Sequence, residues 1–159
     1  HEHFVHQCVS EDTWMRTMLG IDSGLPELPA RETRVEFLRH YAAASEARLA
    51  ALATKDGAWF DGTASFFGVA RSRAWILVRR LTHSAHHRGQ LTLLLRDLGA
   101  ALYSTYGPTA DTGGLAQNGA GVVYRYASVE DLLEAEAEGG LWPKLPGPGA
   151  KPVSERRDC

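Results

Sequence analysis

Three histidines lie within five residues at the start of a leucine-rich segment, where titratable side chains are uncommon. His83 and His87 are four residues apart, so on a helix their imidazoles lie on one face, about one turn from each other. Two imidazoles at this spacing can bind one divalent metal ion, as the helical histidine pairs of zinc sites do. His86 lies about 100° further round the helix, at the rim of such a site.

The pair needs partners, because burying an unsatisfied imidazole costs roughly 1–3 kcal/mol. A metal ion satisfies both histidines when they are neutral. The third ligand should come from a facing helix. His6 is the best candidate, and His3, on nearly the same face one turn earlier, is the alternative. Cys8 is about 200° from His6 around the helix, which excludes it from the ligand set.

Two other interpretations of the histidines stay open at this point. One imidazole of such a pair can be capped by a carbonyl or lie at the surface, and the run from His86 to Gly89 could bind an anion. The leucines on the same helix face and the histidine-rich first segment favour a metal site.

Three segments carry apolar residues at helical spacing, and we predict helices over about residues 1–19, 31–55 and 72–98. The second helix has one stripe, formed by Val35, Leu38, Ala42, Ser45, Leu49 and Leu52. The stripe of the third is formed by Ile76, Arg80, His83, His87, Leu91, Leu94 and Leu98, and Gly99 is its predicted stop. Both stripes should face the core of a bundle.

The connecting segments are rich in glycine, proline and turn residues. We predict a loop over 20–29, a hairpin or irregular crossover over 55–72, a long loop over 106–121, an extended segment over 122–126, and a short helix from Ser128 to Gly139. The domain organisation that follows is a helical domain over 1–140 and a Pro-rich C-terminal tail over 141–159.

The composition narrows the class of protein. Lys and Arg total 17 against 19 Asp and Glu, so a nucleic-acid partner is not expected. No apolar run approaches the roughly 20 residues of a membrane span, so no membrane partner is expected. Two cysteines without metal-ligand spacing fit the cytoplasm. The helical pattern is already under way at His1, so we expect residues upstream of this numbering.

Parts of the sequence resemble a known family. The phrase HSAHHRGQL begins at His83, LLRDLG ends at Gly99, and HQCVSEDTW runs from His6 to Trp14. Together they are similar to the ligand helices of the DinB/YfiT-like four-helix proteins, and the likeness extends over about residues 1–140.

The resemblance implies an all-α fold, an up-down-down-up four-helix bundle that is often a homodimer. It implies a divalent metal, Zn or Ni, bound by His6, His83 and His87. The family usually has a further helix before its first-ligand helix, whereas five residues precede His6 here, so the first helix is expected to be missing from this numbering. The wider superfamily includes S-transferases that use a low-molecular-weight thiol.

Three imidazoles leave a dication with open coordination. The ion could deprotonate a thiol, which attacks a small-molecule electrophile, or activate water for hydrolysis. We therefore expect a metal-dependent thiol S-transferase or related enzyme. The alternative is a non-catalytic metal-binding bundle that acts as a sensor or interaction module.

No catalytic residue can be assigned beyond groups that would support the ligands. These candidates are Glu11, His86 and Gln90. Glu11 could equally be a solvated helix acid, and Gln90 could make a helix–helix hydrogen bond. Arg80, on the stripe itself, is expected to pair with an acid such as Glu36 or Glu46, or to bind a substrate carboxylate.

Overall fold

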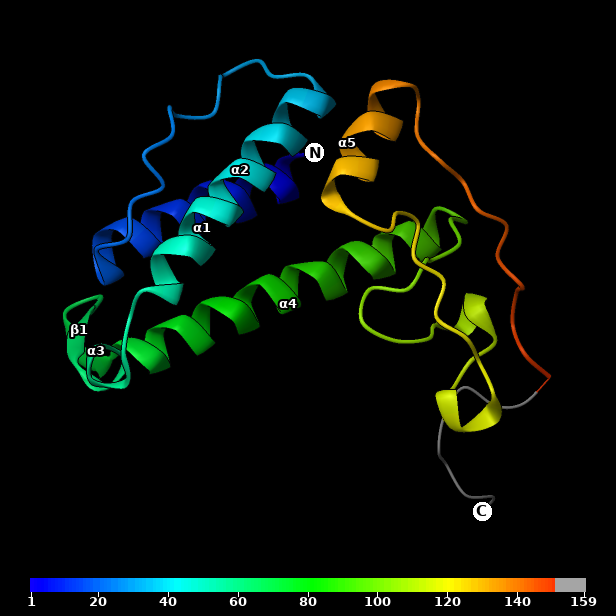
Figure 1. The fold of residues 1–159 in the computed structure, drawn as a ribbon. Coiled ribbons are helices and arrows are strands. Elements are labelled where there is room, and N and C mark those ends of the chain that lie inside the picture. The colour runs from blue at the N-terminus through cyan, green and yellow to red at the C-terminus, as the bar shows by residue number, and fades with distance from the viewer. Residues whose placement is uncertain (151–159) are drawn as a thin grey trace. The chain divides into compact units, whose positions relative to one another are not determined.

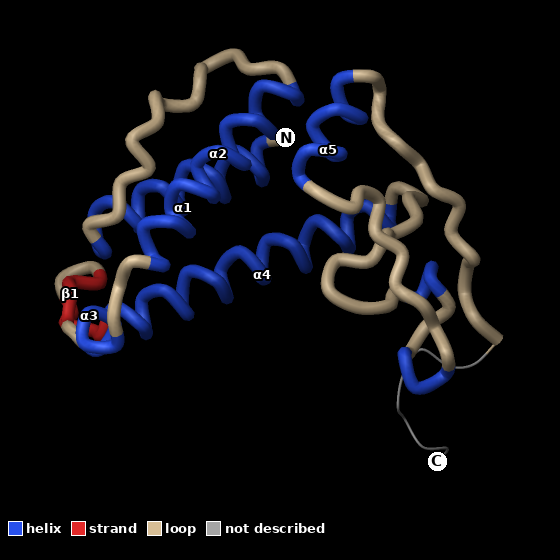
Figure 2. Tube along the Cα trace, in the orientation of Figure 1, coloured by secondary structure: helices blue, strands red, loops and turns tan. Residues whose placement is uncertain are grey.

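The computed structural model describes residues 1–150 and is mostly helical, with one small antiparallel sheet (Figures 1 and 2). The α-helices are α1 (Glu2–Leu19), α2 (Arg34–Ala53), α3 (Gly57–Asp61), α4 (Arg73–Asp97) and α5 (Val129–Ala137). The strands are β1 (Thr63–Phe66) and β2 (Val69–Ser72), and the short 3₁₀ helices are η1 (Ala110–Thr112) and η2 (Ala116–Asn118).

The chain forms two compact units. The first is His1–Gln90, and the second begins at Leu91, so α4 contributes to both. The predicted Pro-rich tail starts within the second unit, and its residues 151–159 lie outside the described part of the chain.

Local sequence signals set the helix ends. Thr33 and Glu36 form a reciprocal capping box at the start of α2, and the Ser128 hydroxyl accepts a hydrogen bond from the Asp131 amide at the start of α5. Gly99, the predicted stop of α4, has a φ of 77°, which glycine adopts without strain. The three long helices predicted from periodicity are therefore confirmed within a few residues.

Helices α1 and α2 run in the same direction. The His1 ring contacts Phe37 near the start of both helices, with centroids 5.6 Å apart, and Glu11 meets Arg48 further along both. Parallel neighbours need a long connection, and residues 20–33 supply it by returning along the outside of the pair (Figure 1).

Helix α4 runs antiparallel to α1 within the first unit. His3 lies beside His87, with ring centroids 5.7 Å apart, whereas Ser10 meets Arg80 at 2.8 Å. Later residues of α1 thus meet earlier residues of α4, and this crossing positions the candidate site.

Of the two structures predicted for residues 55–72, a hairpin or an irregular crossover, the structure has the hairpin, preceded by the short helix α3. Phe66 pairs with Val69, and Phe67 and Gly68 form the two-residue turn with φ values of 47° and 83°. Positive φ at both central residues matches the right-handed twist of the strands. Phe66 then packs with Trp14 of α1, their ring centroids 5.3 Å apart. The apolar core beside it is formed by Met15, Leu19, Ile21 and Ile76.

Two predicted apolar stripes are wrong in part. Leu49 is 68% exposed, because α2 turns Phe37, Ala44 and Arg48 inward. Leu94 and Leu98, which follow the histidines on α4, are 49% and 81% exposed. Periodicity identifies the apolar face of a helix, but whether another element covers that face depends on tertiary packing.

The second unit departs from one prediction. Residues 122–126 form no strand among the described residues. Val123 is instead bound to Ser104: its carbonyl accepts from the Ser104 amide at 2.9 Å, and its own amide donates to Ser104 Oγ at 3.0 Å. The Val123 amide thus donates to a side chain, whereas in a β-sheet it would donate to a backbone carbonyl of the neighbouring strand.

Two buried arginines share one carboxylate between the three long helices. Arg48 and Arg80 are 2% and 1% exposed. Glu11 Oε1 accepts from Arg48 at 3.0 Å, and Glu11 Oε2 lies 3.7 Å from Arg80. The ion pair expected for Arg80 is present, but its partner is Glu11 rather than Glu36 or Glu46. Glu11 therefore connects α1 to both of the helices that pack on it.

Glu11→Ala should lower the free energy of unfolding by about 3 kcal/mol, because two buried guanidinium groups lose their nearest carboxylate. Urea denaturation measures this change. Asp12→Ala is the matched control: Asp12 Oδ1 is 3.7 Å from Arg48 and its side chain is 37% exposed, so the loss should stay below about 1 kcal/mol. Equal losses in the two variants would contradict the assignment.

Candidate metal centre

The structure brings His6, His83 and His87 together. Each offers one ring nitrogen, and the three nitrogens all lie within 4.8 Å of one another. His6 comes from α1 and the other two from successive turns of α4, so the antiparallel crossing of these helices assembles the group. His3 lies outside this group, in contact with the His87 ring, so the geometry favours His6 as the third donor.

The donor set fits a divalent metal. His83 Nε2 and His87 Nε2 are 3.3 Å apart. Two imidazole nitrogens bound to one tetrahedral zinc ion at about 2.05 Å would be roughly 3.3 Å apart. His6 is exposed and would need only a small side-chain adjustment to join them. The predicted ligands are therefore compatible with one shared ion.

Gln90 orients one of the imidazoles. His87 Nδ1 lies 2.9 Å from Gln90 Oε1. An amide oxygen can only accept, so Nδ1 carries the proton and the Nε2 lone pair faces the other histidines. Gln90, predicted as a supporting group, thus contacts a candidate ligand directly and selects its metal-binding tautomer.

Arg80 favours the other tautomer at the second imidazole, that of His83. Its Nη1 lies 2.8 Å from His83 Nδ1. A guanidinium can only donate, so Nδ1 accepts and neutral His83 carries its proton on Nε2, toward His87. Metal binding through Nε2 has to displace that proton. Sequence reasoning missed this contact, although the spacing of three residues on one helix was the signal for it.

Trp14 forms a wall of the site that sequence reasoning also missed. Its ring stacks on His83, with centroids 5.9 Å apart and planes 22° apart, and the Arg80 guanidinium lies 5.7 Å from its centroid. Trp14 is two turns after His6 on α1, and that spacing alone would have placed both side chains on one face.

Both α4 histidines are held in the neutral form. Burial, and then the positive charge of Arg80, lower the pKa of His83. Burial also lowers the pKa of His87 and outweighs the opposing effect of the hydrogen bond that His87 Nδ1 donates to Gln90. Since protonation competes with metal binding, the lowered pKa of His87 extends the pH range in which its Nε2 is available, whereas neutral His83 still carries its proton on Nε2.

The remaining candidates have distinct places. His86 is exposed, with its ring against His87, as a rim position requires. Glu11 contacts no ligand histidine in the described interactions and reaches the site only through Arg80. Cys8 is 1% exposed, and burial raises the pKa of its thiol to about 11, which keeps it protonated and supports its exclusion as a ligand.

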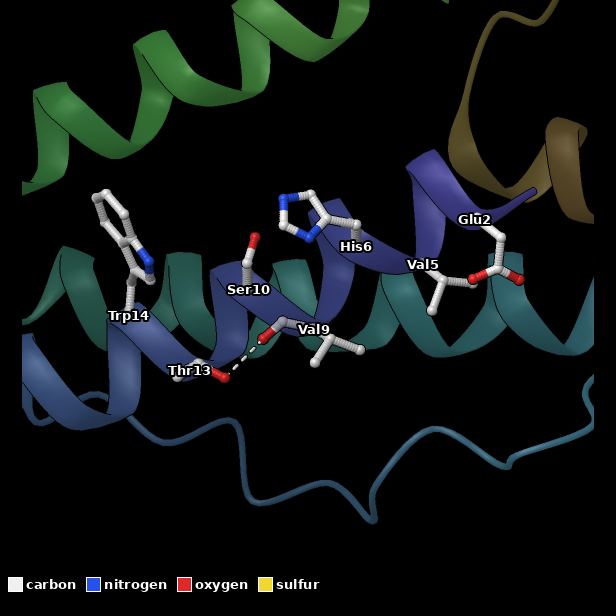
Figure 3. Close-up of a pocket in the computed structure, with 7 residues that line it drawn as sticks. All are labelled: Glu2, Val5, His6, Val9, Ser10, Thr13 and Trp14. Atoms are coloured by element: carbon white, nitrogen blue, oxygen red, sulfur yellow. Dashed lines mark hydrogen bonds between the residues drawn. The ribbon is translucent and has the colours of Figure 1, made fainter.

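A pocket of about 390 Å³ opens beside His6 on α1. It is lined by Glu2, Val5, His6, Val9, Ser10, Thr13 and Trp14. Figure 3 shows His6, Ser10 and Trp14 pointing from α1 toward α4. A small molecule in this pocket would therefore reach a candidate ligand directly from solvent.

Comparison with known proteins supports the resemblance seen in the sequence. The model of the DinB family matches residues 1–117, which include α1 to α4 and all three histidines. The chain belongs to the DinB family. No curated protein and no solved structure was found to match it. Within the described part of this DinB protein, no helix is long and apolar enough to cross a membrane.

Gln90→Ala should weaken metal binding by this DinB protein about 10- to 100-fold, because His87 loses the acceptor that fixes its tautomer. Competition of the loaded protein with a chromophoric chelator measures the affinity. His86→Ala is the matched control, since His86 contacts His87 only through a ring edge. The metal affinity of this variant should equal that of wild type. A Gln90 variant with wild-type affinity would refute the orienting role.

Proposed function

We propose that this DinB protein binds Zn or Ni through His6, His83 and His87 and acts as a metal-dependent S-transferase for a low-molecular-weight thiol. The observation that carries the proposal is three imidazole nitrogens within 4.8 Å of one another beside a pocket open to solvent. Among the described residues no fourth side-chain donor completes this group, and structural zinc sites normally have four.

A divalent ion at this site would supply a lowered pKa for a thiol or water that joins it. A thiol bound there would lose its proton to solvent, and its sulfur would form a bond to an electrophilic carbon. With an alkyl halide the carbon–halogen bond breaks and halide leaves; with an activated alkene the neighbouring carbon takes up a proton. We infer a cytoplasmic setting, where small thiols stay reduced.

The chain's own residues would prepare this chemistry. Gln90 presents the His87 lone pair, and the Trp14 ring covers one face of His83 and excludes water there. Arg80 holds His83 from the buried side. Hydrolysis by activated water is the competing reaction, and the same assay without thiol measures it.

His87→Ala should reduce bound metal from about one ion per chain to near zero, because a single histidine on each helix no longer forms a chelating set. Elemental analysis of wild type and variant, purified identically, measures this. Equal metal content in the two proteins would end the three-histidine assignment.

A panel of thiols and generic electrophiles, assayed with Zn, Ni and Mn in turn, tests the reaction. Turnover that requires thiol and metal together, and that His87→Ala abolishes, supports the transferase. Stoichiometric metal without any turnover supports the alternative, a non-catalytic bundle that serves as a metal sensor or interaction module.

We also propose that the fold is of the up-down-down-up type and that the protein forms a homodimer. The parallel α1 and α2 and the antiparallel α4 agree with the down-down-up part of that order. Apolar side chains left open on α4, Val78 and Leu81 at 59% and 61% exposure, give a second copy a surface to cover.

Leu81→Glu should weaken self-association at least tenfold, because a carboxylate would be buried at the apolar contact. Sedimentation equilibrium over a range of concentrations measures it. Thr82→Glu, on the neighbouring exposed position, controls for added charge and should leave the association constant unchanged. A monomeric wild-type protein, or equal effects of both variants, would contradict the dimer proposal.

A further inference from the structure

The hydroxyl proton of Ser10 makes only a long hydrogen bond within the described part of the protein. Its Oγ accepts from Arg80 Nη1 at 2.8 Å. Its own proton is directed at the Gln7 carbonyl over 3.4 Å, which is long for an O–H donor, and that carbonyl already accepts from Arg80 Nη2 at 2.8 Å. A hydroxyl can donate once while it accepts, so Ser10 retains a proton for another acceptor.

The other hydroxyl in the pocket is satisfied. Thr13 Oγ1 donates to the Val9 carbonyl at 2.9 Å, an interaction drawn in Figure 3. Two hydroxyls thus line the same pocket, but only that of Ser10 rests against a buried cation.

The position of Ser10 relates it to the candidate metal. It lies one turn after His6 and one turn before Trp14, and all three side chains point toward α4 (Figure 3). Residues four apart, such as His6 and Ser10, are separated by about 6 Å along the helix axis, so a short molecule can reach from the histidines to Ser10. The acid of the pocket, Glu2, lies two turns away, roughly 12 Å along the helix.

The group behind Ser10 is the Arg80 guanidinium, whose other terminal nitrogen lies 3.7 Å from Glu11 Oε2. Arg80 is 1% exposed and directs both terminal nitrogens at acceptors, so it cannot itself reach the pocket. Its hydrogen bond polarises the Ser10 hydroxyl and makes that hydroxyl a stronger donor toward an anion.

We infer that Ser10, polarised by Arg80, is the subsite for the carboxylate of a short-chain thiol whose sulfur is directed to the histidines. The inference rests on the proposed function and names its substrate class: a small thiol that bears a carboxylate a few bonds from sulfur. Ser10 then determines specificity among thiols and takes no part in breaking or forming bonds.

Cobalt-loaded protein titrated with mercaptopropionate and with mercaptopropanol tests this, because thiol ligation produces a sulfur-to-cobalt charge-transfer band. The two ligands differ in one feature, a carboxylate against a hydroxymethyl group. Wild type should bind mercaptopropionate about tenfold more tightly, the effect of one charge-assisted hydrogen bond. Ser10→Ala should bind both equally, Thr13→Ala should keep the preference, and Ser10→Asp should reverse it by repulsion.

The possible failures are distinguishable. A wild-type protein that binds both thiols equally overturns the carboxylate subsite and leaves the proposed function intact. A preference that persists in Ser10→Ala also overturns it, since the carboxylate would then be bound elsewhere, for example by the cobalt itself. Cobalt uptake with no response to either thiol overturns the proposed thiol chemistry together with the subsite. The cobalt spectrum of each variant before titration reports that the histidine site is intact.

Discussion

The guanidinium of Arg80 is the interaction on which the first unit of this DinB protein depends. It is almost completely buried, and its terminal nitrogens meet the Ser10 hydroxyl and the Gln7 carbonyl of α1 and the His83 ring of its own helix. These contacts set the register in which α4 packs along α1. Arg80 Nε has no hydrogen-bond partner within residues 1–150, so the buried charge depends on the contacts of the two terminal nitrogens, and few other registers of the two helices would preserve them.

The same register brings together the three histidines of the candidate metal centre. When Arg80 meets Ser10, the next turns of α4 place His83 and His87 opposite His6. Structural and functional constraints therefore act on one interface. Glu11 extends the constraint to α2 through Arg48, so the three long helices are connected by one buried network of charges.

Arg80 and Gln90 act on the two α4 histidines in opposite ways. Gln90 leaves the His87 lone pair free for a metal, whereas Arg80 directs the proton of His83 into the position that a metal would occupy. Binding of a metal ion at His83 Nε2 would therefore have to overcome a contact that also holds the helices together. Such a conflict between folding and binding is typical of functional sites, where the rest of the fold offsets the local cost.

The sequence by itself determined the local features. Helical periodicity located α1, α2 and α4, and the spacing of four residues placed His83 and His87 on one face. Both depend only on the geometry of a single helix, which repeats every 3.6 residues wherever the helix lies. His6 was predicted as the donor from a facing helix and from the resemblance to the DinB family, and Gln90 was predicted as a group that could support the ligands.

Only the tertiary structure decided which partners those faces meet. It made α1 and α2 parallel, chose Glu11 over Glu36 and Glu46 for Arg80, placed Trp14 on His83, and left Leu94 and Leu98 exposed. Each of these depends on the register between helices, and that register is set by buried contacts between residues as far apart as Ser10 and Arg80. Periodicity along one helix carries no information about it.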